Sequence, residues 1–316
     1  MTNYSRLLEK PKQFHALTGY TIEEFHALLP AFMLSFLSYM QGRTLEGKER
    51  HKRRYVAYKN SPLPTMEDKL LFILMYLRKA TTQDIFGEVF GMAQPVVNKW
   101  IHLLLPCLNH ALAELGEIPA RSASELHITE GEDKLYFQDG TERPIQRPKD
   151  QEAQQLYDSG KKKRHTVKNN TVTNAQAKIV LLTDTCEGKK HDKRIADEAG
   201  FSLPRGSTLY QDNGFQGFTL KGVIIVQTKK KPRGGELTIE EKERNREISR
   251  VRIRVEHAIG GVKRYRIVKD QLRNWKPGFR DLVMETCCGL HNFRLNFRPW
   301  HYAAIPDLEA SYATSK

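Results

Sequence analysis

Cysteine is scarce in this chain. Only four cysteines occur in 316 residues, namely Cys107, Cys186, Cys287 and Cys288, and their spacing matches no metal-binding motif. So few cysteines exclude a small disulfide-stabilised scaffold. They are typical of free, mostly buried thiols in a reducing compartment.

Long apolar runs are also absent. The most apolar stretch, "FHALLPAFMLSFLSYM" at 25–40, contains a histidine and a proline. It is shorter than the roughly 20 residues that a membrane-spanning helix needs. The segment "MTNYSRLLEKPK" at 1–12 has no apolar signal-peptide core. Because neither segment suits a membrane, we expect no membrane partner, and we expect 25–40 to form a core helix. Internal repeats and long low-complexity tracts are missing as well.

Acidic residues are fewer than basic ones. The chain has 37 Asp and Glu against 51 Lys and Arg, a formal net charge of +14. This excess favours polyanionic partners, with nucleic acid first and an anionic membrane surface second. Two lysine-rich segments, "KKKRH" at 161–165 and "KKKPR" at 229–233, are either phosphate contacts or solvated loops.

Helical patterns dominate the part before residue 110. A helix is expected from about 21 to 40, where Thr21 and Glu24 could form a capping box. The basic, proline-closed segment 42–64 is either a solvated linker or an arm that contacts phosphates. We take 1–64 as an N-terminal helical segment with a basic linker.

Residues 65–110 predict three helices, of which the last two are joined by a tight turn. The second helix is short and Gly91 suits its end, while Pro95 suits the first turn of the third. The last two helices are either a DNA-binding helix-turn-helix or an ordinary helical hairpin. In the first case, Gln94, Asn98 and Lys99 at the start of the third helix would contact base edges in the major groove.

Strands alternate with helices beyond residue 130, which predicts a mixed α/β domain. Strands are expected at 134–139, 164–174, 177–185, 207–212 and 223–228, and helices at 192–200 and 278–295. Asp139 and Asp212 each end a hydrophobic strand before a glycine-containing turn. Such strand ends often bind ligands, but Asp-Gly is also a turn signal. Asp184 and Asp192 are competing acids, and Asp192 could instead cap a helix.

Glu256 is the one acid in the basic segment "RVRIRVEHAIGGVKRYR" at 250–266. Alternating Val, Ile and Arg fit a strand, but the helix-forming residues upstream favour a continuous helix. On that helix, Arg252, Glu256 and Lys263 share one face. Glu256 is then either an exposed ion-pair partner of Arg252 or a ligand of a divalent metal.

Several motifs resemble the DDE transposases of bacterial insertion sequences and the related Harbinger elements. They are "DGTERPIQRP", "SGKKKRHTVKN", "HDKRIADE", "QDNGFQG", "KKKPRGGELT" and "SRVRIRVEHAIGGVKRYR", between residues 139 and 266. The segment 67–108 is similar to the helix-turn-helix that precedes the catalytic domain in this family. The resemblance therefore divides the chain into a helix-turn-helix at 65–110, a catalytic domain at 130–297 and a tail at 298–316.

This resemblance implies an RNase H-like α/β fold and a metal-dependent enzyme. It assigns Asp139, Asp212 and Glu256 as catalytic carboxylates that hold two Mg²⁺ or Mn²⁺ ions, and it demotes Asp192 to a possible site residue. Arg252 and Lys263 match basic positions of the family that contact DNA. A tyrosine common three residues before that arginine is replaced here by Ser249.

The implied activity is cleavage at the terminal inverted repeats of an element and strand transfer into target DNA. Double-stranded DNA is the implied partner, a homo-oligomer the implied assembly and the bacterial cytoplasm, at the nucleoid, the implied location. The alternative is a transposase-derived DNA-binding protein that has lost cleavage.

Overall fold

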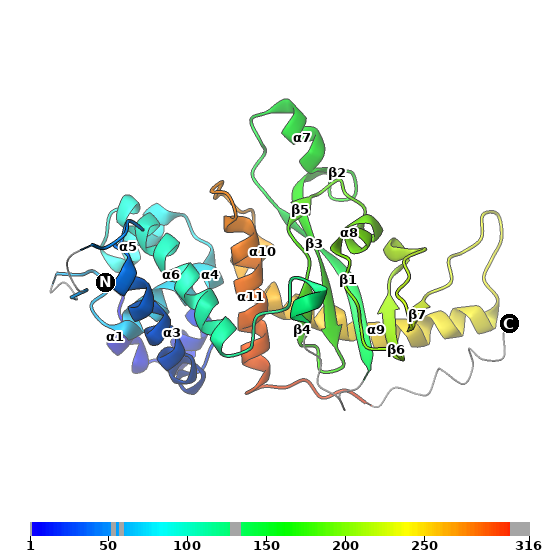
Figure 1. Ribbon diagram of the computed structural model, residues 1–316, viewed down its shortest axis with the longest axis horizontal. Helices are drawn as coiled ribbons and strands as arrows, with labels where there is room; N and C mark the ends of the chain where they lie inside the picture. Colours follow the sequence, from blue (N-terminus) through cyan, green and yellow to red (C-terminus); the bar gives the residue numbers. More distant parts are fainter. Residues whose placement is uncertain (1, 52–54, 57–59, 127–133, 304–316) are drawn as a thin grey trace.

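The computed structural model describes residues 2–51, 55–56, 60–126 and 134–303 (Figure 1). A group of helices occupies one side of the molecule and a twisted sheet the other, with the last long helix between them. The mixed α/β class expected from the sequence is confirmed. Parts of the basic linker, at 52–54 and 57–59, and most of the tail, at 304–316, lie outside the described residues.

The N-terminal side is entirely helical. The 21–40 helix is confirmed as α3, and its capping box between Thr21 and Glu24 is formed. Thr65 and Asp68 form a second capping box at the start of α4. The helices are α1 (Tyr4–Leu8), α2 (Pro11–Thr18), α3 (Ile22–Gly42), α4 (Met66–Lys79), α5 (Gln83–Phe90) and α6 (Gln94–Glu114).

A tight turn joins α5 to α6. Gly91 ends α5 in the left-handed conformation, with φ of 67°, and Pro95 lies in the first turn of α6, as expected. A Cβ atom at Gly87 would lie 2.3 Å from the carbonyl oxygen of Met92. Only glycine permits this close approach, so the geometry of the turn depends on Gly87 as well as on Gly91.

The sheet combines antiparallel and parallel strands in the order β2-β3-β1-β6-β7, with β4 and β5 paired to β3. β1 pairs antiparallel with β3 and parallel with β6, and β6 pairs parallel with β7. The strands are β1 (Leu135–Pro144), β2 (Asp158–Ser159), β3 (Arg164–Asn174), β4 (Ile179–Leu182), β5 (Cys186–Glu187), β6 (Ser207–Gln211) and β7 (Val223–Gln227). The five expected strands are thus confirmed, with shifted ends.

Helices cover both faces of this sheet. Alternate residues of β1 point to opposite faces, so Tyr136 packs with Ala196 of α8 while Phe137 packs with Val255 of α9. The helices of this half are α7 (Gln151–Tyr157), α8 (Asp192–Ala199), α9 (Ile239–Val262), α10 (Arg266–Lys269) and α11 (Phe279–Leu295), with a short 3-10 turn η1 (Ala123–Glu125) before β1.

The continuous helix expected through residues 250–262 is confirmed. α9 begins at a capping box between Thr238 and Glu241 and runs without a break to Val262. Val251, Val255 and Ile259 are buried against the sheet, which explains why the alternating Val, Ile and Arg pattern does not form a strand here. Figure 1 shows α9 crossing the sheet and extending past β7.

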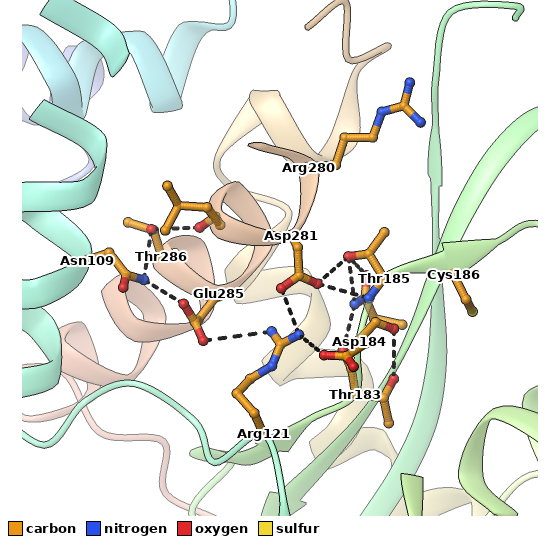
Figure 2. A network of polar contacts seen from close by, with 12 residues as sticks. Asn109, Arg121, Thr183, Asp184, Thr185, Cys186, Arg280, Asp281, Glu285 and Thr286 are labelled. Carbon is orange, nitrogen blue, oxygen red and sulfur yellow. Dashed lines mark hydrogen bonds and ion pairs between the residues drawn. The ribbon is translucent and has the colours of Figure 1, made fainter. Parts of the chain in front are cut away.

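One hydrophobic cluster contains side chains of the helical side, of β4 and of α11. Within this cluster, α11 packs against α6. A polar network adds to this contact (Figure 2). Arg121, which follows α6, pairs through Nη2 with Asp184 and with Asp281 of α11, each at 2.7 Å. Asn109 of α6 donates to Glu285 of α11 at 2.9 Å. The network therefore connects the helix-turn-helix, the sheet and α11.

None of the helices in the described ranges is both long enough and apolar enough to cross a membrane. The 25–40 stretch belongs to α3, whose Phe25, Leu28, Phe32 and Phe36 are fully buried. It is therefore the core helix that the sequence predicts.

Candidate active site

Asp139 and Asp212 come directly after the last paired residues of the parallel ladder between β1 and β6. The ladder between β1 and β6 ends with Gln138 opposite Gln211, and each aspartate is the next residue along its strand. Since neighbouring strands lie about 4.8 Å apart, the register brings both carboxylates to one edge of the ladder. We call Asp139 and Asp212 the acid pair.

The expectation that Asp139 ends its strand is wrong. β1 continues to Pro144 because the long antiparallel strand β3 pairs with it as far as Thr166. Asp212 does follow its strand directly, where it accepts a hydrogen bond from the Gly214 N–H at 2.8 Å and caps the 3-10 turn η2 (Asn213–Phe215). Asp139-Gly140 is thus part of a strand, and only the Asp212-Asn213-Gly214 segment forms a turn.

The surroundings of Asp139 disfavour the charged form of its carboxyl group. Burial, and after it the Asp212 carboxylate, raise the pKa of Asp139 from 3.8 to about 6. Arg252 and the Gly140 N–H, which donates to Asp139 at 2.8 Å, act in the opposite direction but do not cancel the effect. Burial and the neighbouring carboxylate thus disfavour the charged form of Asp139, and a bound divalent cation would favour it.

α9 presents Arg252 and Lys263 toward this pair. Arg252 lowers the pKa of Asp139; burial lowers the pKa of Lys263, and Asp139 opposes that effect. At about 100° per residue, Lys263 returns to within about 20° of Arg252 around the helix, and Glu256 to within about 40°. Glu256 thus projects from the same stripe of α9, and its side chain is exposed.

No hydrogen bond or ion pair joins Glu256 to Arg252, Asp139 or Asp212 within the described ranges. The ion pair with Arg252, which the sequence left open, is therefore not formed there. The structure brings together Asp139, Asp212, Arg252 and Lys263, and it places Glu256 on the adjoining stripe without direct contact.

Asp192 lies on the α8 side of the sheet but close to the acid pair, because it adds to the effects that raise the pKa of Asp139. A Cβ at Gly140 would be 2.8 Å from the Asp192 carboxylate, and one at Gly214 would be 3.4 Å from it. Gly140 follows Asp139 in β1 and therefore faces the other side. Lys168 pairs with Asp192 at 3.5 Å. His191, rather than Asp192, is the N-cap of α8, so the expected cap is wrong.

The three predicted base-reading residues already have side-chain partners. Gln94 and Asn98 both donate to Oε1 of Gln83 in α5, Asn98 at 3.2 Å. Lys99 pairs with Glu46 at 3.3 Å across an exposed surface. Gln83 thus orients the first turn of α6. Base contact by Gln94, Asn98 and Lys99 stays a prediction.

Two family models match this chain. Residues 138–292 match the family model described as DDE superfamily endonuclease, and residues 61–114 match the helix-turn-helix of DDE superfamily endonuclease. The chain belongs to the DDE superfamily of endonucleases. The matched ranges contain the acid pair and α9 in one case, and α4 to α6 in the other.

Two relatives are transposases by name. One, from Microchaete diplosiphon, is named as a transposase for insertion sequence element IS702; it is 29% identical over 234 residues, which cover 74% of this chain and 82% of the relative. Another, from Streptomyces albus G, is named as a transposase for insertion sequence element IS112; it is 23% identical over 207 residues, covering 65% and 72% of the two chains. No solved structure matches.

The sheet of this DDE endonuclease is RNase H-like. Three antiparallel strands, in the order β4-β3-β1, are followed by β6 and β7 parallel to β1, with helices on both faces. This order places the first two acids on adjacent strands and the third on a covering helix. The fold class implied by the resemblance is confirmed.

The residues present fit a divalent metal through the acid pair. No three His, Cys, Asp or Glu side chains of the described ranges lie close enough to hold an ion together. Mg²⁺, however, is commonly bound by one or two carboxylates and completes its shell with water and phosphate oxygens. Asp139 and Asp212 supply such a pair, and the pKa of Asp139 is raised first by burial and then by the neighbouring Asp212.

A ladder of glutamines beside the acids was missed from the sequence. Gln211 donates to Gln138, and Gln227 of β7 donates to Gln211 at 3.0 Å. Gln138 and Gln211 are fully buried. The repeated "QD" in "YFQD" and "LYQD" is the signal that could have shown it. The ladder ties together the three strands from which the acid pair emerges.

Lysines around the site differ in their surroundings. Lys162, from the first lysine-rich segment, contributes to lowering the pKa of Lys263 and therefore lies near the site. In the second segment, Lys229 pairs with Glu241 and Lys231 with Glu236 at 3.1 Å. The first segment is thus the better candidate for phosphate contact, and the second is neutralised by acids near the start of α9.

Asp139→Asn is expected to stabilise the protein at neutral pH in the absence of divalent ions. The folded state binds the Asp139 proton more tightly than the unfolded state, so stability falls as pH rises from about 4 to about 6. The variant avoids this loss, and its gain at pH 7.5 is at most about 3 kcal/mol. Urea unfolding in EDTA at pH 4.5 and pH 7.5 measures it. An equal difference at both pH values, or the same gain in Asp197→Asn, would contradict the assignment.

Proposed function

We propose that this DDE endonuclease is a transposase that cuts DNA at the terminal inverted repeats of its own element and joins the ends to target DNA. The observation that carries the proposal is the acid pair, held at the edge of the β1–β6 ladder opposite the basic stripe of α9. The names of the two relatives support it.

Asp139, Asp212 and Glu256 would hold the divalent ions, Mg²⁺ or Mn²⁺. The bound metal would activate water, and later a DNA 3′-hydroxyl, and would stabilise the leaving oxygen. The register of β1 and β6, which brings Asp139 and Asp212 to one edge of the ladder, supports this role for the two acids. Glu256 projects from the neighbouring stripe of α9 and would complete the set when DNA and metal are bound.

The basic residues would position DNA. Lys263 and Arg252 flank Glu256 on α9 and would neutralise the phosphate at the cut, because phosphoryl transfer depends mainly on positioning and charge stabilisation. At the other end of the molecule, Gln94, Asn98 and Lys99 would exchange their internal contacts for contacts with the terminal repeat. Cutting at paired ends would require a homo-oligomer on the DNA, and the setting would be the bacterial nucleoid.

The test combines a labelled end of the element, a supercoiled target plasmid and Mg²⁺ or Mn²⁺. Wild-type protein is expected to produce nicked ends and joined products. Specific binding without nicking or joining under either ion would favour the alternative, a DNA-binding protein derived from a transposase that has lost cleavage.

Glu256→Gln is the variant that tests the third carboxylate. We expect it to lower the rate of cutting and joining by about 10³-fold, since loss of a metal ligand costs several kcal/mol in the transition state. Glu247→Gln is the matched control, because Glu247 is exposed and lies about 180° away around α9. Equal activity in both variants would remove Glu256 from the site.

A further inference from the structure

A cavity separates the helix-turn-helix from a loop of the endonuclease domain. Its volume is about 420 Å³. On one side it is lined by Gln83, Gln94 and Asn98, the residues at the start of α5 and α6. On the other side it is lined by the 271–276 loop, from Gln271 through Trp275. Two of the three predicted base-reading residues, Gln94 and Asn98, therefore face this loop and not open solvent alone.

The 271–276 loop is anchored to both halves of the protein. Leu272 is buried, and its N–H donates to the Pro144 carbonyl at the end of β1 at 3.1 Å. Asn274 hydrogen-bonds to His102 of α6 at 3.2 Å. The loop thus has a defined position relative to the helix-turn-helix and to the sheet.

Its remaining side chains are exposed and suit a nucleic-acid partner. Arg273 and Lys276 are exposed, and Trp275 is 47% exposed. The guanidinium of Arg280 lies over the Trp275 ring at 4.4 Å from its centre. An aromatic ring with adjoining cations is the combination on which proteins bind nucleotides, through stacking and phosphate contact.

Basic side chains lie between this loop and the acid pair. Lys162 and Lys269 both contribute to lowering the pKa of Lys263, which itself lies near Asp139. Arg266 acts in the same way on Lys79 at the end of α4. Positive charge therefore runs from the helix-turn-helix along α10 to the site, as a path for a DNA backbone requires.

We propose that the 271–276 loop is a second DNA-contacting element, which forms one groove with the helix-turn-helix. The occupant is the DNA end of the element: Trp275 packs against a nucleotide, Arg273 contacts a phosphate, and α6 reads the neighbouring bases. The inference rests on the proposed DNA binding by α6 and extends it to a surface of the endonuclease domain.

The test is binding of the full-length protein to a labelled duplex of the element's end, measured by fluorescence anisotropy without divalent ions. Trp275→Ala is expected to weaken binding by about 10-fold. Arg273→Ala is expected to weaken binding. It is also expected to reduce the slope of log Kd against log salt concentration by about one, because one phosphate contact is lost. Arg6→Ala, an exposed arginine on α1, is the matched control and should bind as the wild type does.

Intrinsic fluorescence gives a second readout that is independent of affinity. In a Trp300→Phe background, the element's end is expected to change the tryptophan emission, and adding Trp275→Phe is expected to remove most of this change, because the remaining Trp100 is only 5% exposed. Unchanged unfolding temperatures would show that the variants are folded.

Different outcomes separate this inference from the proposed function. If Trp275→Ala and Arg273→Ala bind as wild type while Asn98→Ala weakens binding, the loop inference is overturned and the helix-turn-helix assignment stands. If wild type does not bind the element's end, both are overturned. A change in self-association by Trp275→Ala without DNA, with DNA binding unchanged, would instead assign the loop to a second copy of the chain.

Discussion

Replacing Asp212 or Asp139 by asparagine is expected to lower cutting and joining by at least about 10³-fold and to leave binding to the element's end unchanged. Asparagine keeps the shape of the side chain. Its oxygen can still accept the hydrogen bonds that the Gly214 and Gly140 N–H groups donate, each at 2.8 Å. Each variant therefore loses the negative charge and little else, so its effect reports on the metal-binding role.

The measurement is a time course of nicked and joined products with Mg²⁺ and with Mn²⁺, beside an anisotropy titration in EDTA. Asp197→Asn is the matched control, since Asp197 is an exposed acid on α8 that pairs with Lys193 at 2.6 Å. Strand transfer retained in Asp212→Asn or Asp139→Asn would remove that acid from the site. Loss of DNA binding in either would indicate a structural role instead.

Asp281→Ala is expected to lower the free energy of unfolding by about 2–4 kcal/mol, because it removes the more buried of the two carboxylates on Arg121 Nη2 and the acceptor of the Thr185 N–H. Asp281 accepts hydrogen bonds from both the N–H and the hydroxyl of Thr185, at 2.9 and 2.6 Å, in addition to its ion pair with Arg121 (Figure 2). Although burial opposes it, these contacts lower the pKa of Asp281.

Asp184→Ala is the matched control for this network. Asp184 pairs with the same Nη2 atom of Arg121, at the same 2.7 Å, but its side chain is 94% exposed. An exposed ion pair contributes less than about 1 kcal/mol, so we expect little change in urea unfolding. Equal losses in the two variants would mean that burial does not decide the strength of these contacts.

Much of the local structure could be predicted from the sequence, for reasons that act over a few residues. Thr21 and Glu24, and Thr238 and Glu241, satisfy the free N–H groups at helix starts wherever such a helix forms. Gly91 supplies a conformation that other residues rarely adopt. The continuous helix of α9 follows from its upstream helix-forming residues. The sequence motifs also identified the family.

Only the tertiary structure decided which acids meet. The parallel register of β1 and β6 places Asp139 beside Asp212, and the position of α8 brings Asp192 close to both from the other side of β1. The extension of β1 past Asp139 depends on its partner β3, not on the Asp-Gly signal. The contacts of Arg121 and the groove beside Trp275 likewise join segments far apart in sequence, and no local periodicity encodes such distances.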